Sequence, residues 1–309
     1  MTNYQNFHAA YPKSKRVAYT LGAVVFAVLL AGFWNYHLVD GFGKEVIAGN
    51  TIGDTSRLAG GYEQHGSGFG FIFAAIAGLA ATFTACNCVV FAMIPGLACS
   101  TDGSGTTSAM KAFGAFTAGV LVITGGYGIF AGFLGAEGVE VLNQRSVRLG
   151  QAQAVFSMLG LIMLVWGGLE LGYLDRIKQR FSATTRAFFN QTTTKALLLG
   201  TLVGLFAVGR PFPVFREFLT YAASAQNPIY GAGVMMVQGL GQIAVMALLF
   251  FIILWLGGDR LGKAAVQKPY RFRLISGLAL ITGGTYFIYY WGLAFIFDIG
   301  RWGFKLGWY

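Results

Sequence analysis

The sequence predicts an all-α integral membrane protein with seven transmembrane helices: one N-terminal helix, then two inverted three-helix repeats whose first helices are broken. Composition is the first observation that predicts this fold. Of the 309 residues, 55% are hydrophobic and 11% are charged, and the mean hydropathy is +0.60. A water-soluble domain carries roughly 25% charged residues, so this chain cannot cover a soluble surface. The other two observations are seven apolar stretches of bilayer-crossing length and the interruption of two of them.

The seven expected spans divide the chain into four parts. The spans cover residues 17–39, 67–98, 109–134, 151–174, 196–223, 229–257 and 274–297. The first is about twenty residues long and no small-residue cleavage site follows it, which indicates a retained helix and not a signal peptide. The expected parts are an N-terminal cytoplasmic tail, extra helix and extracytoplasmic loop (1–66), a first repeat (67–174), a basic cytoplasmic loop (175–195), and a second repeat with an aromatic tail (196–309).

Basic residues gather on one side of the predicted membrane. The N-terminus and the loops 175–195 and 259–273 carry most of the Lys and Arg, whereas the loop 40–66 leans acidic. Because cytoplasmic loops are enriched in Lys and Arg, we expect a multi-pass membrane protein with a cytoplasmic N-terminus and an extracytoplasmic C-terminus. This role in orientation accounts for the net charge of +10. The expected surroundings are therefore the lipid bilayer, and no nucleic acid is expected as a partner.

Two similar motifs indicate the inverted repeat. Gly78-Leu-Ala-Ala stands before Cys86 in the second span, and Gly204-Leu-Phe-Ala stands before Arg210-Pro-Phe-Pro213 in the fifth. Aligning Gly78 with Gly204 places Cys86 opposite Phe212. With three spans in each unit, the second copy enters the membrane from the opposite side. Paired interrupted spans in two inverted halves predict a site where the halves meet.

Cys86 and Cys88 are the candidate reactive residues, with Asn87 and Pro95 in support. Asn87 adds a polar group to an apolar stretch and Pro95 removes a helical hydrogen bond, so we expect the helix to break there. Two thiols one residue apart are consistent with a redox pair, with a site for Cu(I) or a similar soft metal, or with inert packing. No cofactor is expected except that metal under the second interpretation. A disulfide between the two thiols would be strained and easily reduced, so a mixed disulfide with a partner protein is an equal alternative.

The second break supplies a charge and two prolines. Pro211 and Pro213 interrupt the helix, and Arg210 beside them is expected to favour the thiolate form of a facing cysteine. Gln238 and Gln242 lie one helical turn apart in the sixth span, which places them on one helix face. They are therefore candidates to line the same cavity as the breaks.

Arg216 and Glu217 are further charges in the fifth span. Because they are adjacent on a helix, we expect them to have different partners; Arg216 either acts inside the bundle or reaches the headgroups. The sequence shows no phosphate-binding Gly-Lys loop, nucleophile–base set or paired catalytic carboxylates. His8, His37 and His65 lie outside the middle of any span, so a haem site is not expected.

The two motifs resemble the signatures of the CcdA/DsbD family of transmembrane thiol–disulfide conduits. Gly78-Leu-Ala-Ala-Thr-Phe-Thr-Ala-Cys86-Asn-Cys88 through Ile94-Pro95 is similar to the first-half signature, a cysteine in a proline-broken helix. Gly204-Leu-Phe-Ala-Val-Gly-Arg-Pro-Phe-Pro213 is similar to the second-half signature, a cysteine flanked by prolines. The resemblance implies a six-helix core of inverted repeats in a bacterial-type inner membrane, with the first span as an extra N-terminal helix. It also implies electron transfer from cytoplasmic thioredoxin to extracytoplasmic thiol proteins, as in cytochrome c maturation.

This chain departs from the family pattern at both breaks. Phe212 stands where the family has its second cysteine, and Ala85 stands where a proline precedes the first. The sequence therefore leaves three hypotheses open. The first is a thiol–disulfide conduit in which Cys86 and Cys88 act as the pair toward thioredoxin-fold partners. The second is a transporter for a soft metal or small solute, and the third is a non-catalytic subunit that packs with other membrane subunits.

Overall fold

The computed structural model describes residues 11–84, 106–175, 180, 182, 191–267, 269–294, 296–300 and 302–308. Within these residues the chain is helical and contains no strand, and seven helices are long and apolar enough to cross a membrane. The predicted all-α membrane protein with seven spans is confirmed. The inverted-repeat relation between its halves stays a prediction.

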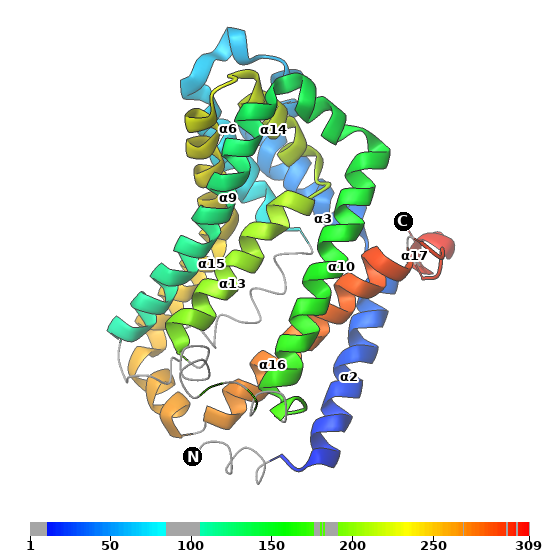
Figure 1. Cartoon of the computed structure of the whole chain (residues 1–309), viewed down its shortest axis with the longest axis vertical. Coiled ribbons are helices and arrows are strands. Elements are labelled where there is room, and N and C mark those ends of the chain that lie inside the picture. Colours follow the sequence, from blue (N-terminus) through cyan, green and yellow to red (C-terminus); the bar gives the residue numbers. More distant parts are fainter. Residues whose placement is uncertain are drawn as a thin grey trace.

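The long helices follow the predicted spans, and several of them extend further (Figure 1). They are α2 (Lys13–Gly32), α6 (Tyr62–Thr82), α9 (Thr106–Asn143), α10 (Arg145–Glu170), α13 (Thr192–Gly209), α15 (Pro228–Gln267) and α16 (Pro269–Phe287). Shorter segments are α3 (Tyr36–Gly41), the π-helix η1 (Phe42–Gly49), α4 (Asn50–Ile52), α5 (Thr55–Ala59), α14 (Pro213–Ser224), the π-helix η2 (Ile288–Ala294) and α17 (Trp302–Lys305). The last part of α9 follows a kink at Gly135, where φ is 70°. Glu137 and Glu140 end the apolar pattern there before the helix itself ends.

Much of the connection 40–66, expected as a loop, is helical. Asn35 begins α3 by accepting a hydrogen bond from the Leu38 amide at 2.9 Å, and Asp54 begins α5 by accepting one from the Ser56 amide at 3.0 Å. Such side chains satisfy the amides that a first helical turn leaves without partners. The charges and glycines of this stretch hide these short helices from a hydropathy-based prediction.

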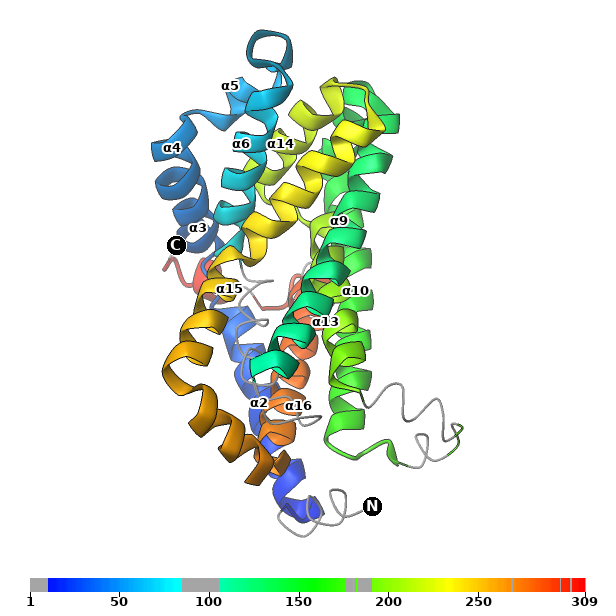
Figure 2. The ribbon, with the colours of Figure 1, turned by 90° about the vertical axis from the view of Figure 1, so that its left-hand side faces the viewer.

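Glycines set how closely the long helices approach. At Gly128 of α9, an added Cβ would lie 2.2 Å from the carbonyl oxygen of Gly231 on α15, so the two backbones touch. Without a side chain between them, helices in a membrane gain dispersion contacts along the whole crossing. The other glycine crossings join α9 to α13 (Gly119 and Gly200), α6 to α15 (Gly78 and Gly241) and α10 to α16 (Gly160 and Gly284). Figure 2 shows α9, α13 and α15 side by side in this arrangement.

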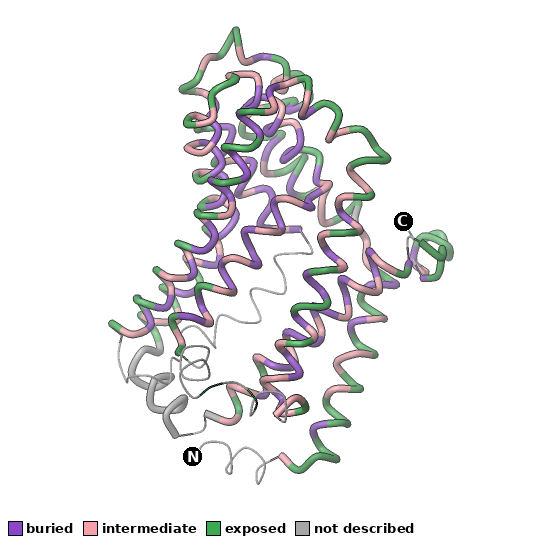
Figure 3. The backbone as a smooth tube through the Cα atoms, in the orientation of Figure 1, coloured by how far each residue is buried: buried purple, intermediate pink, exposed green. Residues whose placement is uncertain are grey.

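The extra N-terminal helix α2 lies at the edge of the bundle beside α16 (Figure 1). It is exposed along most of its length (Figure 3), as expected for a helix that faces lipid. The aromatic C-terminal tail packs on its last turn: the Phe33 ring lies 5.5 Å from the Trp302 ring and 5.2 Å from the Trp308 ring. The tail therefore holds one end of α2, in agreement with an aromatic anchor at a membrane interface.

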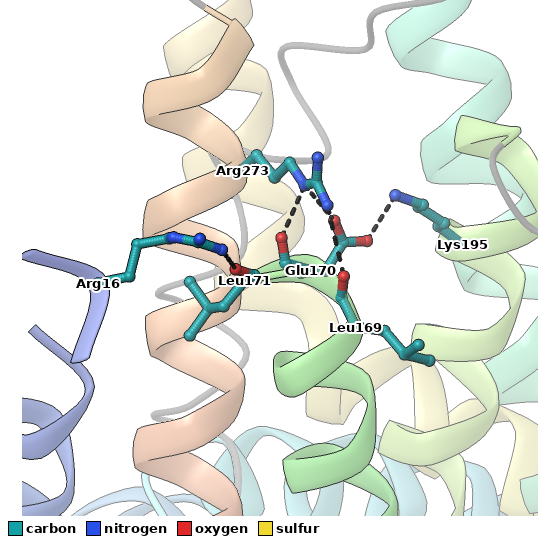
Figure 4. A network of polar contacts seen from close by, with 6 residues as sticks. All are labelled: Arg16, Leu169, Glu170, Leu171, Lys195 and Arg273. Atoms are coloured by element: carbon teal, nitrogen blue, oxygen red, sulfur yellow. Dashed lines mark hydrogen bonds and ion pairs between the residues drawn. The ribbon is translucent and has the colours of Figure 1, made fainter. Parts of the chain in front are cut away.

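Polar side chains tie four helices together at the other end of α2 (Figure 4). The last turn of α10 has free carbonyl groups, and two arginines donate to them. Arg273 of α16 donates to the Glu170 carbonyl at 2.7 Å, and Arg16 of α2 donates to the Leu171 carbonyl at 2.7 Å. The Glu170 carboxylate also pairs with Lys195 of α13 at 2.5 Å and with Arg273 at 3.6 Å. The C-terminal end of α10 and the N-terminal ends of α2, α13 and α16 therefore lie on the same side of the bundle. This is what helices that cross the membrane in alternating directions require.

Replacing Glu170 by Gln should destabilise the protein by about 1–2 kcal/mol, because Lys195 and Arg273 lose a mostly buried counter-charge. The thermal unfolding midpoint in detergent measures this. Asp298→Asn is the matched control, since its pair with Lys305 is exposed on both sides, at 66% and 46%. We expect almost no shift from that control. Equal shifts in the two variants would contradict a special role for the Glu170 network.

Candidate functional site

α6 ends at Thr82, inside the second predicted span and before the break predicted at the cysteine pair. The Thr82 hydroxyl is buried and has backbone acceptors on α15, the Gln242 carbonyl at 2.9 Å and the Gly241 carbonyl at 3.2 Å. The neighbouring glycine crossing brings α6 close enough for these bonds, since a Cβ at Gly78 would lie 2.2 Å from the Gln238 carbonyl oxygen. The end of α6 is therefore fixed against α15. The predicted site residues Cys86, Asn87, Cys88 and Pro95, like Cys99, lie outside the described residues.

The second break follows from its two prolines. A proline disfavours the helical conformation in the residue before it, and here the preceding residues are Arg210 and Phe212. Both are extended, with ψ of 119° at Arg210 and 124° at Phe212. Pro213 then opens α14 at a position where its missing amide proton costs nothing. The span predicted at 196–223 is therefore two helices, α13 and α14, joined by a bend at residues 210–212.

Gln242 connects the end of α6 to the second break. Its side-chain oxygen accepts a hydrogen bond from Nη1 of Arg210 at 3.3 Å, and its side-chain nitrogen donates to the Val203 carbonyl of α13 at 3.3 Å. Its own carbonyl is an acceptor for Thr82. Arg210 and Gln242 are 1% and 2% exposed, so this chain of contacts lies inside the bundle. The residues at which α6 and α13 end are thus joined through one glutamine.

Gln238 lies one turn earlier on α15 and is fully buried. Among the described residues, neither its amide nitrogen nor its amide oxygen has a hydrogen-bond partner. An unpaired buried amide is costly, and such groups usually mark a site that takes a ligand, a water or another part of the chain. Gln238 therefore offers one donor group and one acceptor to whatever faces it.

Arg216 stabilises the second break from α14. Its Nε donates to the Arg210 carbonyl at 2.6 Å, which satisfies an acceptor that the bend removes from the helical pattern. Arg216 is 3% exposed, so it acts inside the bundle and does not reach the headgroups. Glu217 points elsewhere and accepts a hydrogen bond from the Thr55 hydroxyl of α5. The two adjacent charges have different partners, as their spacing predicts.

The N-terminal segment also reaches the second break, which the sequence did not indicate. A Cβ at Gly43 of η1 would lie 2.5 Å from the Ala80 carbonyl oxygen of α6 and 3.2 Å from the Phe212 ring. Asp40 lies just before it, where burial raises the pKa of its carboxyl from 3.8 to about 6, although the positive charges of Arg210 and His37 oppose this shift. Asp40 and Arg210 are far apart in the sequence, and no sequence motif contains both of them.

The metal interpretation depends on residues that the structure does not describe. Within the described part of the chain, no three His, Cys, Asp or Glu side chains gather in a group that could hold a metal ion. A soft-metal site would therefore have to use Cys86 and Cys88 themselves, and that interpretation stays untested.

A comparison with protein families decides the classification. The family model for the cytochrome c biogenesis protein transmembrane region matches residues 126–286, just over half of the chain. The chain belongs to this family. The matched region contains the second break, Gln238 and Gln242, and it begins after the cysteine pair. No curated protein and no solved structure matches the chain. Family membership confirms the predicted resemblance and leaves the activity of this member to be inferred from its own residues.

Proposed function

We propose that the protein is a thiol–disulfide conduit that passes reducing equivalents across an inner membrane to extracytoplasmic thiol proteins. The observation that carries the proposal is the contact chain from Thr82 through Gln242 to Arg210, because it places the end of α6 beside the second helix break. Cys86 follows Thr84 by two positions in the sequence, and two residues of chain span at most about 7 Å. Membership of the cytochrome c biogenesis family supports this class of function.

In the proposed exchange, one cysteine thiolate attacks the disulfide of an oxidised thioredoxin-fold protein outside the membrane. A mixed disulfide forms, and the released partner sulfur takes up a proton. The thiolate of the other cysteine then attacks the mixed disulfide, so that the partner leaves with two thiols and Cys86 and Cys88 form a disulfide. Reduced thioredoxin in the cytoplasm restores both thiols by the reverse exchange. Arg210 is the buried positive charge that would favour the attacking thiolate.

Helix pairing supports the proposed inverted repeat. α9 packs against α15, and α10 packs against α16, so equivalent helices of the two halves meet each other. α6 packs on α15 in the same manner as α13 packs on α9. A two-fold relation between the halves would produce this pattern and would bring the two broken helices to one central site.

Phe212 favours a second function, that of a non-catalytic subunit in a larger membrane complex. Its side chain is 2% exposed and fills the position at which a second cysteine would stand. The second break therefore supplies no thiol of its own. If Cys86 and Cys88 only pack, the helix junction would hold the fold together for a partner subunit.

The test is to trap the mixed disulfide. Replacing either Cys86 or Cys88 by Ala leaves one thiol, which can attack a partner but cannot resolve the product. We expect at least one of these variants to accumulate an adduct with a thioredoxin-fold protein, seen on non-reducing gels and identified by mass spectrometry. Cys99→Ala is the control and should accumulate none.

Other results would contradict the conduit. If neither single variant forms an adduct, and the double variant keeps its function and co-purifies with fixed partners, the subunit hypothesis replaces it. If the purified protein instead contains a soft metal that is lost on replacing either cysteine by Ser, the Cu(I)-type site replaces it.

A further inference from the structure

A second group of polar side chains, two of them buried and two partly buried, lies between α9, α10 and α14. It consists of Tyr127, Arg148, Gln151 and Arg216, named here the arginine cluster. Arg216 donates from Nη2 to the side-chain oxygen of Gln151 at 3.4 Å, in addition to its bond to the Arg210 carbonyl. Its third nitrogen, Nη1, is buried and has no hydrogen-bond partner among the described residues. A guanidinium that is 3% exposed thus keeps one donor group unused.

Two other members of the cluster also keep donors unused. The Tyr127 hydroxyl and Nε of Arg148 are buried atoms without a hydrogen-bond partner in the described part of the chain. Tyr127 lies beside Arg216, and Arg148 is near enough for its positive charge to act on Arg216. Within the described residues, neither arginine forms an ion pair with a carboxylate. The cluster therefore combines two positive charges that form no ion pair with a carboxylate in the described part of the chain. Its Tyr127 hydroxyl lies within reach of the Arg216 guanidinium, but neither group makes a hydrogen bond of good geometry with the other.

The beginning of α10 adds to the same positive potential. The helix starts at Arg145, its first turn contains no acidic residue, and no side chain caps it. Arg148 is in that first turn. Helix N-termini carry a partial positive charge and free amides, which favour anions.

We propose that the arginine cluster binds an oxyanion of the phosphate or sulfate type, supplied either as a soluble anion or as a lipid phosphate group. Guanidinium groups donate in pairs to such oxygens, and a phenol and an amide complete the donors around them. An anion there would offset the buried charge of Arg216 and the partly buried charge of Arg148 beside it. Since Arg216 also holds the Arg210 carbonyl, the bound anion would fix the second break as well. Anion binding requires neither cysteine, so its test does not depend on whether the protein carries out thiol exchange.

The experiment measures thermal unfolding of the full chain in detergent free of phospholipid. Sodium sulfate is titrated against sodium chloride at matched ionic strength, and phosphatidylglycerol is added in a second arm. We expect a saturable rise in the unfolding midpoint, with the half-saturating concentration raised about tenfold or more in Arg148→Gln. Tyr127→Phe should raise it by a few fold. Arg148 is the main variant because it does not hold the Arg210 carbonyl, so its loss spares the helix bend.

Arg57→Gln is the matched control, since it removes the same charge from a side chain that is 88% exposed. It should leave the half-saturating concentration unchanged. Saturation by sulfate without lipid identifies a soluble anion, and saturation only with phosphatidylglycerol identifies a lipid phosphate; either result supports the site. No saturable effect in either arm, or equal effects of Arg148→Gln and Arg57→Gln, would overturn the proposal.

Discussion

Gly128→Ala should lower the free energy of unfolding by about 2–3 kcal/mol, because the new methyl group has no room. Its carbon would lie 2.2 Å from the Gly231 carbonyl oxygen and 2.6 Å from the carbonyl carbon, and both are backbone atoms. No rotamer change can relieve such a contact, so α9 and α15 must move apart. Further along, α15 also carries Gln242, which connects the end of α6 to the second break. The thermal unfolding midpoint in detergent is the measurement.

Gly126→Ala is the matched control, two residues away in the same helix. No heavy atom lies within 4 Å of a Cβ at Gly126. The substitution should therefore stabilise the protein by about 0.5–1 kcal/mol, because alanine loses less backbone freedom than glycine in a helix. If both variants shift the midpoint alike, the backbones of α9 and α15 do not touch in the folded protein.

This pair of glycines also shows what the sequence could not predict, namely which residues contact a distant helix. Gly126 and Gly128 have nearly the same neighbours in the chain, and local patterns cannot say which one meets α15. The second break is the opposite case. Pro211 and Pro213 act on the residues directly before them, so the bend at 210–212 could be predicted from the sequence alone. Hydropathy is similarly local, which explains why the seven spans were predictable and their ends less so.

Parts of the candidate site depend on contacts between distant segments. The sequence predicted that Gln242 lines the cavity at the breaks, but it did not predict that Gln242 pairs with Arg210, which was expected to face a cysteine. The inward direction of Arg216 was one of two open alternatives, and the carbonyl freed by the bend explains it. Nothing in the sequence indicated that Asp40 lies near Arg210, because this contact requires the N-terminal segment to fold back over the second break.

Asp40→Asn should stabilise the protein at neutral pH and leave its stability almost unchanged below about pH 3. Burial raises the pKa of Asp40 from 3.8 to about 6 in the folded state, so folding disfavours the charged carboxylate. Well below pH 3.8 the carboxyl is protonated in both states and no penalty exists. As the pH rises toward 6, the unfolded chain loses its proton first and stability falls; above that it stays low. One pKa unit corresponds to about 1.4 kcal/mol, and partial exposure reduces the full effect to about 1–2 kcal/mol.

The pH profile of the unfolding midpoint separates this effect from a general gain in stability. Asp54→Asn is the control, and its effect on stability should have the opposite sign. Hydrogen bonds from Ser56 lower the pKa of Asp54, so the charged form is favoured in the folded protein. The difference between Asp40→Asn and the unsubstituted chain should open between about pH 4 and pH 6 and then stay constant. If the difference in unfolding midpoint between the two proteins is the same at every pH, the carboxyl of Asp40 has its ordinary pKa and is not buried beside Arg210. The negative charge at Asp40 would then be fully solvated, and η1 would not cover the second break as closely as Gly43 indicates.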